Sequence, residues 1–424
     1  MRNVLFILSD EHNPHVLGAA GHPLVKTPHL DRLATAGTRF RWAYSPSPIC
    51  VPARAALATG RHVHEIGYWD NAQAYDGRVP SWGHRVQQAK GRCVSIGKLH
   101  YRDGADPTGF DEQILPMHIV DGVGDVLGAV RDPMPVRVKS KTLAKEIGPG
   151  DSSYQRYDRS IADAACAWLR DEAGREPDRP WVLFVGFVCP HFPLIAPPEF
   201  YRLYRPEDIP LPKPGPAAGA ADHPWLAAFR RCFVQDEAFT DETRRIAIAS
   251  YYGLVSFVDD NVGKVLGALE ASGQAANTRV IYASDHGDNL GARGLWGKST
   301  MFEESVGIPA IVAGPDVPRG KVSTTPVSLL DVYPTVTRSL DLPALPEERT
   351  LSGRSLFELA AAPDDPERVI LAQYHAAGAA TGAFMLRQAA TSTSTTWACP
   401  RSSSTSRPIR RSSSTSRSRP PRSR

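Results

Sequence analysis

The sequence of 424 residues lacks the features that mark disulfide-rich and membrane-spanning proteins. Its six cysteines form no CxxC pair and follow no regular spacing. This distribution argues against a disulfide framework and against a zinc site, and it fits a reducing compartment. No run of about 18 apolar residues occurs, which excludes a membrane-spanning helix. We therefore expect a protein without a membrane partner.

The N-terminal segment, MRNVLFILSDEH, has too few apolar residues for a typical secretory signal. Its apolar run covers only residues 4–8 and ends at Asp10 and Glu11, with no small-residue cleavage site. We interpret it as the first β-strand of the protein and expect a cytoplasmic location.

Charge is unevenly distributed along the chain. The net charge is +4, but residues 389–424 contain eight Arg and no acidic residue. The rest of the chain has 41 basic and 45 acidic residues, a mildly acidic balance that gives no indication of a nucleic-acid partner. The length is sufficient for one large α/β domain or two smaller ones.

Four apolar runs, at residues 4–8, 93–96, 181–188 and 279–283, each end in polar residues that are capable of chemistry. Continuous apolar runs are typical of strands that are buried on both faces of a parallel sheet. Helical patterns lie between them, at 31–36, 160–172 and 246–269. The sequence predicts an α/β fold with a large, mostly parallel sheet sandwiched by helices, and a site at the carboxyl ends of the strands.

Asp10, Asp285 and His286 are predicted to be metal ligands. A divalent cation binds anionic oxygens or imidazole that converge from separate strands, and buried carboxylates without such a partner would be costly. Asp285 alone could also be an ordinary N-cap or turn residue. The tetrapeptide Asp-His-Gly-Asp, which begins at Asp285, favours the metal site.

The pentapeptide Cys50-Val51-Pro52-Ala53-Arg54 is the most informative short motif. A C-x-P-x-R pattern by itself also fits a buried Cys before a helix. In combination with the other motifs, in their order and approximate spacing, it resembles the sulfatase branch of the alkaline phosphatase superfamily over roughly residues 3–388. Those motifs are Leu8-Ser9-Asp10, Thr27-Pro28-His29-Leu30-Asp31-Arg32-Leu33, Gly97-Lys98-Leu99-His100, Pro190-His191-Phe192-Pro193, Ser284-Asp285-His286-Gly287-Asp288 and Gly297-Lys298.

The resemblance implies that a formylglycine-generating enzyme oxidises Cys50 to formylglycine (3-oxoalanine). The modified side chain would join Asp10, Asp285 and His286 around one divalent metal ion, and Arg54 would steady it. The resemblance further implies that four side chains surround the sulfuryl oxygens and transfer protons, namely Lys98, His100, His191 and Lys298. Asn71 is expected to face the leaving group.

Two positions depart from the commonest sulfatase pattern. Glu11 stands where many members have a second Asp, so its role as a metal ligand is open, with a position behind the ligands or at the surface as the alternative. His286 stands where many have Asn, an arrangement of choline-sulfatase-like and phosphonate-monoesterase-like members. A His ligand suits Mn²⁺ or Zn²⁺ better than Ca²⁺, which prefers oxygen ligands. The identity of the metal is open, and Ca²⁺ and Mn²⁺ are the candidates.

The leading hypothesis is metal-dependent hydrolysis of small-molecule sulfate esters, that is, a sulfuric ester hydrolase. One hydroxyl of the hydrated aldehyde would attack sulfur, and His191 or Lys298 would protonate the leaving alcohol. His100 would then deprotonate the second hydroxyl, and sulfate would leave. The alternatives are a phosphonate monoester or phosphodiester hydrolase with the same site, and a C-terminally damaged, non-catalytic member. The alcohol part of the substrate is open, as is homo-oligomer formation.

Residues 389–424 are predicted to be a disordered Ser/Arg-rich tail after a catalytic domain at 1–388. SSSTS occurs at 402–406 and 412–416, and codons for Glu-Leu-Phe-Asp-Leu in a GC-rich gene encode it when they are read one base late. Our hypothesis is a reading-frame shift near Gln388, which would leave a C-terminal subdomain incomplete. An authentic Arg/Ser tail of RNA-binding type is the alternative. Translation of the gene in the alternate frame tests the hypothesis, because a coherent strand-and-turn sequence should emerge.

Overall fold

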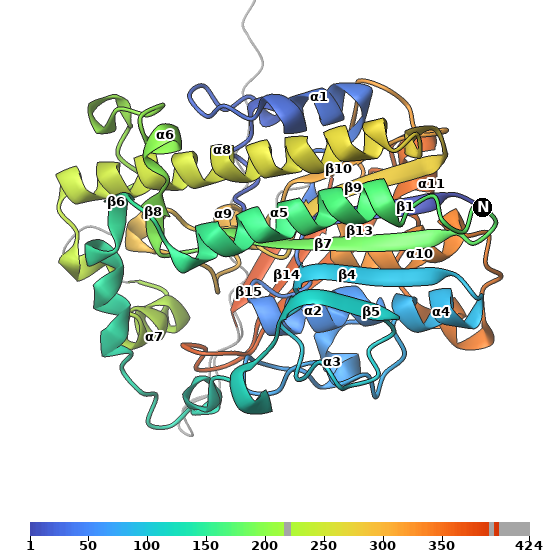
Figure 1. Ribbon diagram of the computed structural model, residues 1–424. Helices are drawn as coiled ribbons and strands as arrows, with labels where there is room; N and C mark the ends of the chain where they lie inside the picture. Colours follow the sequence, from blue (N-terminus) through green and yellow to red (C-terminus); the bar gives the residue numbers. More distant parts are fainter. Residues whose placement is uncertain (216–221, 390–393, 398–424) are drawn as a thin grey trace, which may run out of the picture.

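The computed structural model describes residues 1–215, 222–389 and 394–397. Its centre is a mixed, mostly parallel sheet, in which the described residues form eight strands in the order β11-β2-β10-β9-β1-β7-β4-β5 (Figure 1). The strands β9, β1, β7, β4 and β5 are parallel to one another, whereas β10 is antiparallel to both β9 and β2. The α/β class and the mostly parallel sheet are therefore confirmed. The bounds of the sheet strands are β1 (Asn3–Asp10), β2 (Gly37–Phe40), β4 (Arg92–Lys98), β5 (Glu112–Met117), β7 (Trp181–Pro190), β9 (Thr278–Ser284), β10 (Ala310–Ala313) and β11 (Lys321–Ser323).

The central strands are apolar throughout because helices cover both faces of the sheet (Figure 1). Successive side chains of strand β1 point to opposite faces of the sheet. Leu5 and Ile7 join a core with α1, α5 and α8, while Val4, Phe6 and Leu8 join a second core on the opposite face. The second core includes residues of α2, α4, α10 and α11. The helices are α1 (Pro28–Ala36), α2 (Cys50–Thr59), α3 (Val63–Ile66), α4 (Trp82–Gln88), α5 (Ser153–Asp171), α6 (Pro198–Tyr201), α7 (Pro224–Cys232), α8 (Asp241–Ala271), α9 (Glu303–Val306), α10 (Val332–Ser339) and α11 (Leu356–Ala361).

The predicted helices are present but longer than the sequence pattern indicated. Helix α5 begins after Ser152, whose side chain accepts a hydrogen bond from the backbone N–H of Gln155. Its first turns are mostly polar, so the apolar periodicity becomes visible only further along the chain. Helix α8 likewise begins after the N-cap Thr240. None of the helices in the described ranges is both long and apolar enough to span a membrane.

Smaller sheets flank the main one. They pair β3 (Ala43–Tyr44) with β12 (Val327–Ser328), β6 (Ile147–Pro149) with β8 (Leu194–Ala196), and β13 (Val369–Tyr374) with β14 (Ala383–Gln388) and β15 (Ser394–Trp397). Strand β14 ends at the predicted domain boundary, and the backbone of β15, which lies beyond it, pairs antiparallel with β14. Most of the predicted tail, at 390–393 and 398–424, lies outside the described residues. The tail, its frameshift origin and an incomplete C-terminal subdomain therefore stay predictions.

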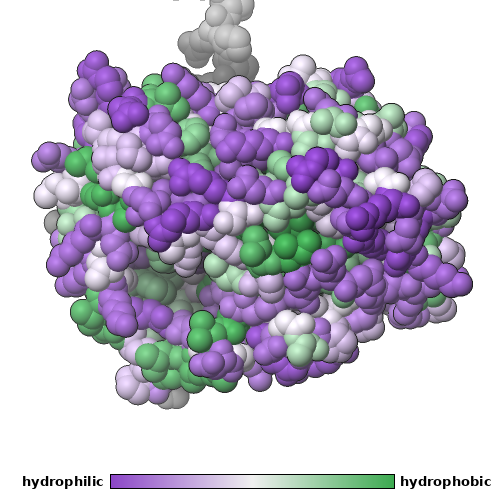
Figure 2. Space-filling model, viewed as in Figure 1, coloured by the Kyte–Doolittle hydropathy of each residue, from purple (hydrophilic) through white to green (hydrophobic). Residues whose placement is uncertain are grey.

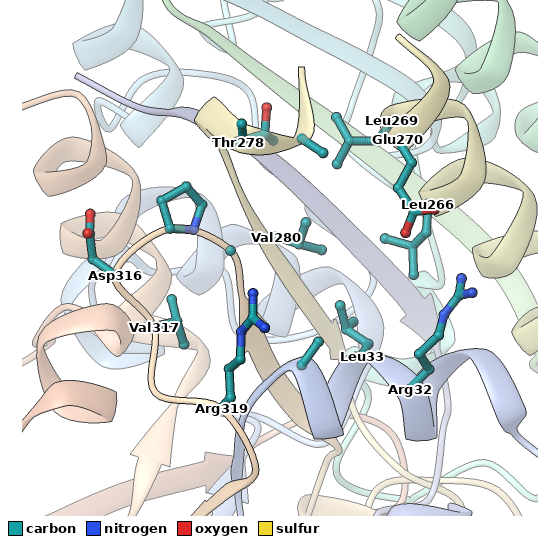
Figure 3. Close-up of a pocket in the computed structure, with 15 residues that line it drawn as sticks. Arg32, Leu33, Leu266, Leu269, Glu270, Thr278, Val280, Asp316, Val317 and Arg319 are labelled. Carbon is teal, nitrogen blue, oxygen red and sulfur yellow. The ribbon is translucent and has the colours of Figure 1, made fainter. Parts of the chain in front are cut away.

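A wide cavity of about 590 Å³ lies at the end of the sheet where β9 begins. Thr278 and Val280 of β9 line it together with Leu33, and Arg32 and Arg319 extend beside it (Figure 3). This is the end opposite to the carboxyl ends of β1, β7 and β9. The polar motifs of the sequence follow those carboxyl ends, and the wide cavity is therefore separate from them.

Candidate active site

The carboxyl ends of four parallel strands bring the predicted polar motifs together. Asp10 is the last residue of β1 and lies opposite Pro190 of β7, while Ser9 lies opposite Ser284 of β9. Lys98 ends β4, which pairs with β7. Because the strands end in register, the residues that follow them meet around the first turn of α2.

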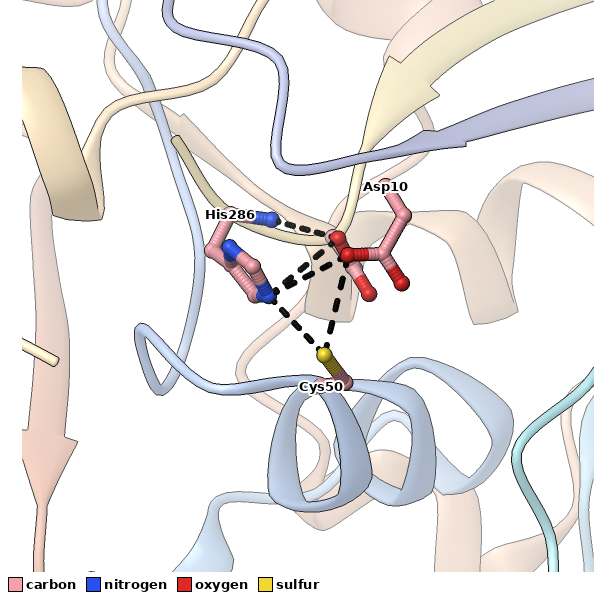
Figure 4. A group of neighbouring side chains, drawn as sticks. Asp10, Cys50 and His286 are labelled. Carbon is pink, nitrogen blue, oxygen red and sulfur yellow. Dashed lines mark hydrogen bonds and ion pairs between the residues drawn. The ribbon is translucent and has the colours of Figure 1, made fainter. Parts of the chain in front are cut away.

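Cys50 is the first residue of α2, and every residue of this helix is buried. Its Sγ lies 3.2 Å from His286 Nε2, 3.2 Å from Lys298 Nζ and 3.6 Å from Asp10 Oδ1. Asp10, Cys50 and His286 point toward one another (Figure 4). Burial raises the pKa of the Cys50 thiol to about 11, so the unmodified side chain is a protonated thiol near neutral pH and a poor nucleophile.

Asp10, Cys50, Asp285 and His286 form a buried group whose ligand atoms all lie within 4.8 Å of one another. His286 Nε2 is 3.6 Å from an oxygen of each carboxylate. His286 Nδ1 is 3.1 Å from the Gly287 carbonyl oxygen, so a proton on Nδ1 would leave the Nε2 lone pair facing the two carboxylates. Two carboxylates and one imidazole nitrogen that converge in this way fit a divalent metal ion.

Arg54 holds the two carboxylates in place. Its Nε donates to Asp285 Oδ2 at 2.8 Å, its Nη2 to Asp10 Oδ2 at 3.1 Å, and its Nη1 to the Lys98 carbonyl oxygen at 2.8 Å. The guanidinium therefore orients Asp10 and Asp285, and the role implied by the resemblance, that it steadies the formylglycine, stays a prediction. Burial opposes the charged form of Asp10, but the positive charges of Lys98 and its other neighbours hold its pKa well below the usual range.

Lys298 and His191 form a pair on the other side of Cys50. Lys298 Nζ lies 2.7 Å from His191 Nε2. Burial and the Lys298 charge hold the pKa of His191 well below its usual value, so the imidazole is neutral. Burial disfavours the Lys298 ammonium, but the surrounding negative charge, to which Asp10 and Asp285 contribute, raises its pKa. Lys298 therefore keeps the proton and donates a hydrogen bond to His191 Nε2.

Glu11 is fully buried, which excludes the surface position considered for it. Its Oε2 lies 3.1 Å from Lys298 Nζ and 3.4 Å from His191 Nε2, while Oε1 is buried without a hydrogen-bond partner among the described residues. Burial raises the pKa of the Glu11 carboxyl well above its usual value. Glu11 does not belong to the group around Cys50, but it forms a second potential metal-binding group with Asp10 and His191.

His100 and Asn71 lie at the edge of this site. The His100 backbone has φ 61°, and its Nδ1 is buried without a partner in the described part of the chain. Burial, with the charges of Lys98 and Arg54, lowers the pKa of His100, so its ring is neutral. Asn71 Oδ1 accepts a hydrogen bond from the Val51 N–H at 3.2 Å, in the first turn of α2.

Ser284 and Asp288 were not singled out in the sequence, although both stand in a motif that was. Ser284 Oγ accepts from the His12 N–H at 2.9 Å and so connects the residues after β1 with those after β9. Asp288 Oδ1 accepts from the Gly297 N–H at 3.0 Å, next to Lys298. Ser284 acts through a hydrogen bond to a distant segment and Asp288 through one to Gly297, nine residues further along the chain, and no sequence pattern singles out either contact.

Known proteins resemble this chain over most of its length. A model of the family described as "Sulfatase" matches residues 2–342. Choline-sulfatase from Rhizobium meliloti (strain 1021) is 29% identical in an alignment of 341 positions that covers 79% of this chain and 66% of that protein. Arylsulfatase K from Danio rerio is 28% identical in an alignment of 423 positions that covers 91% of this chain and 74% of that protein.

A solved structure shows the fold. Phosphonate monoester hydrolase from Silicibacter pomeroyi superposes with a TM-score of 0.72 at 23% sequence identity, over 94% of this chain and 87% of that one. The predicted alkaline-phosphatase-like fold is therefore confirmed. Since the family model also covers most of the chain, the protein belongs to the sulfatase family of the alkaline phosphatase superfamily and is a hydrolase of that family.

Proposed function

We propose that this chain hydrolyses sulfate monoesters of small-molecule alcohols after a formylglycine-generating enzyme has converted Cys50 to formylglycine. The observation that carries the proposal is the position of Cys50 Sγ, which lies 3.2 Å from both His286 Nε2 and Lys298 Nζ. Family membership supports this proposal, as do the names of the two relatives, choline-sulfatase and arylsulfatase K. The cytoplasmic location expected from the sequence is proposed with it.

Asp10, Asp285 and His286 would hold one divalent metal ion together with the modified side chain of residue 50. When bound, the metal and the hydrated aldehyde would supply a Lewis acid and a nucleophilic hydroxyl. Both Ca²⁺ and Mn²⁺ are candidates, because carboxylates suit either ion and the imidazole of His286 favours the second.

The side chains around Cys50 suit an anionic ester. A sulfate monoester repels a nucleophile because its oxygens carry negative charge, and buried ammonium groups offset that charge. Lys98 and Lys298 supply two such groups, with Lys98 Nζ 2.6 Å from Asp10 Oδ2. Lys298 holds a proton at Nζ within 3.2 Å of Cys50 Sγ, so it is placed to protonate the departing alcohol oxygen. His191 accepts a hydrogen bond from Lys298 and keeps that ammonium in position.

Mass spectrometry of protein made together with a formylglycine-generating enzyme tests the proposal. The tryptic peptide that contains Cys50 should lose about 18 Da when the thiol is exchanged for a carbonyl oxygen. The peptide that contains Cys93, a buried cysteine outside the motif, is the internal control and should keep its mass. The converted protein should then hydrolyse aryl sulfate or choline sulfate. An unmodified Cys50 in protein that still turns over sulfate esters would contradict the mechanism.

Hydrolysis of phosphonate monoesters or phosphodiesters is a second candidate. The Asp285-His286 pair favours it, because the sequence resemblance associates this order with phosphonate-monoesterase-like members as well. Turnover of phenyl phosphonate without turnover of any sulfate ester would decide for this candidate. Converted, metal-bound protein that is inactive on both ester classes would instead support a non-catalytic member.

A further inference from the structure

A cavity of about 170 Å³ opens beside Lys298 and is walled by aromatic side chains. Lys298 and Asn71 line it and also contact Cys50 or its neighbour Val51, so the cavity is continuous with the candidate active site. Viewed as in Figure 1, the molecular surface is hollowed beside α7, and hydrophobic residues lie in the hollow (Figure 2). The aromatic walls come from separate parts of the chain and are Phe192, Phe229, Phe233 and Trp296.

These walls are held by packing from behind. Trp225 stacks on Phe229 with ring centroids 5.5 Å apart and an interplanar angle of 9°. Phe239 stacks on Trp296 at 4.1 Å and 14°. A ring that enters the cavity therefore meets surfaces that are already ordered, which lowers the cost of binding. The cavity volume is comparable to the roughly 150 Å³ of an apolar cavity that binds benzene, so it suits a single ring.

A carboxylate that lines the cavity is paired with an arginine. Arg137 Nη2 donates to both oxygens of Asp125 at 2.6 and 2.5 Å, so the carboxylate that lines the cavity is already neutralised. Arg137 and Asp125 stand just before two 3₁₀ helices, η4 (Val138–Lys145) and η3 (Val126–Ala129). The backbone N–H of Arg137 donates to the Cys232 carbonyl oxygen at 2.8 Å, which ties this segment to α7.

Protein cations also lie over two of the aromatic rings. The Arg137 guanidinium carbon is 5.8 Å from the Phe233 ring centroid, and Lys298 Nζ is 5.4 Å from the Phe192 centroid. Aromatic side chains attract a quaternary ammonium through their ring faces. Since Arg137 and Lys298 already occupy such positions, a further cation would meet two like charges and no free carboxylate from Asp125.

We propose that this cavity binds the alcohol part of the ester, that it selects a single uncharged or anionic aromatic ring, and that Arg137 excludes cationic alcohols by neutralising Asp125. The inference rests on the proposed function, because it places the ester group at Cys50. Arg137 is thus a specificity-determining residue of this chain.

Binding to the Cys50→Ser variant tests the inference without turnover and without the effect of leaving-group reactivity. Calorimetric titration should give a dissociation constant for phenyl sulfate at least about tenfold below that for choline sulfate. In the same background, Arg137→Gln removes one cation and frees Asp125, so the ratio of the two affinities should shift toward choline sulfate by about tenfold. Arg319→Gln removes the same charge from the wide cavity at the other end of the sheet and should leave the ratio unchanged.

Phe233→Leu keeps an apolar side chain and should weaken phenyl sulfate without weakening choline sulfate, with the circular dichroism spectrum unchanged. A purely structural Arg137 would lower both affinities equally when replaced, and that result would overturn the inference. Equal or reversed affinities in the Cys50→Ser protein would overturn it as well. Selective binding of phenyl sulfate, combined with failure of the converted enzyme to hydrolyse any sulfate ester, would refute the proposed function and leave the inference standing.

Discussion

Replacement of Arg54 by methionine tests whether a buried ion-pair network organises the site. The guanidinium is paired with Asp10 and Asp285, and the side chains of all three are at most 2% exposed. In Arg54→Met, Asp10 keeps Lys98 at 2.6 Å, but Asp285 Oδ2 loses the guanidinium that pairs with it. Removal of one partner from a buried pair costs about 3–5 kcal/mol, because the other charge is left uncompensated.

The expected loss can be measured as a shift of the melting temperature. An unfolding entropy of about 2.1 cal/mol/K per residue gives about 0.9 kcal/mol/K for the 424 residues. The substitution should therefore lower Tm by about 3–6 °C when calorimetry is done in the presence of a chelator. Mn²⁺ should recover part of this loss, and it should raise the Tm of Arg54→Met more than that of the unsubstituted protein, since a bound cation neutralises Asp285.

Arg170→Met is the matched control. Arg170 forms an exposed pair with Asp171, and exposed pairs contribute about 0–1 kcal/mol, so its Tm should change by about 1 °C or less. An Arg54→Met protein that, in the presence of a chelator, melts within about 1 °C of the unsubstituted protein would refute the reasoning. It would mean that the fold does not depend on charge compensation between Arg54 and the two carboxylates.

Three further predictions concern catalysis, metal binding and pH. Lys298→Met should lower kcat/KM of the converted enzyme for sulfate esters by about 10²–10³-fold, whereas Lys264→Met, at an exposed pair with Asp260, should leave it unchanged. Saturation with metal at about 100 times its Kd should raise the free energy of unfolding by about 2.7 kcal/mol, and a His286→Ala variant that keeps the full thermal shift would contradict the assigned ligand set. Burial raises the pKa of Asp259 to about 7, so its folded form holds a proton more tightly than its unfolded form, and the stability from this group is lost as pH rises through about 7. As the pH rises from about 5 to 8, the Tm of Asp259→Asn should therefore fall less than that of the unsubstituted protein. Equal slopes of Tm against pH in the two proteins would contradict the raised pKa of Asp259.

The strands and their chemistry could be read from the sequence because both leave local signals. Residues 4–8 and 181–188 are continuous apolar runs, and such runs occur where both faces of a strand are covered. Asp10 and His191 follow shortly after these runs, so the parallel arrangement predicted that both lie at one edge of the sheet. Helix lengths were underestimated where the first turns are polar, as in α5, because the cap at Ser152 depends on hydrogen bonds rather than on apolar periodicity.

Other features depend on contacts between distant segments. The sequence places Arg54 in the motif of Cys50, but only the folded chain shows that its three nitrogens donate to Asp10, Asp285 and the Lys98 carbonyl. Glu11 stands beside Asp10 in the sequence, yet its side chain turns to Lys298 and His191, with its backbone at φ 69°. No sequence pattern contains the direction of a side chain that is set by a partner hundreds of residues away.

By itself, the sequence determined the α/β class, the edge of the sheet that carries the polar motifs, and the family to which the chain belongs. These properties follow from apolar runs and short motifs, which are local. Only the tertiary structure decided which atoms meet at Cys50 and which side chains wall the cavity beside it. Arg137 and Phe233 lie in segments without periodicity or motif, and they become neighbours of Lys298 only when η4, α7 and the residues after β9 pack together.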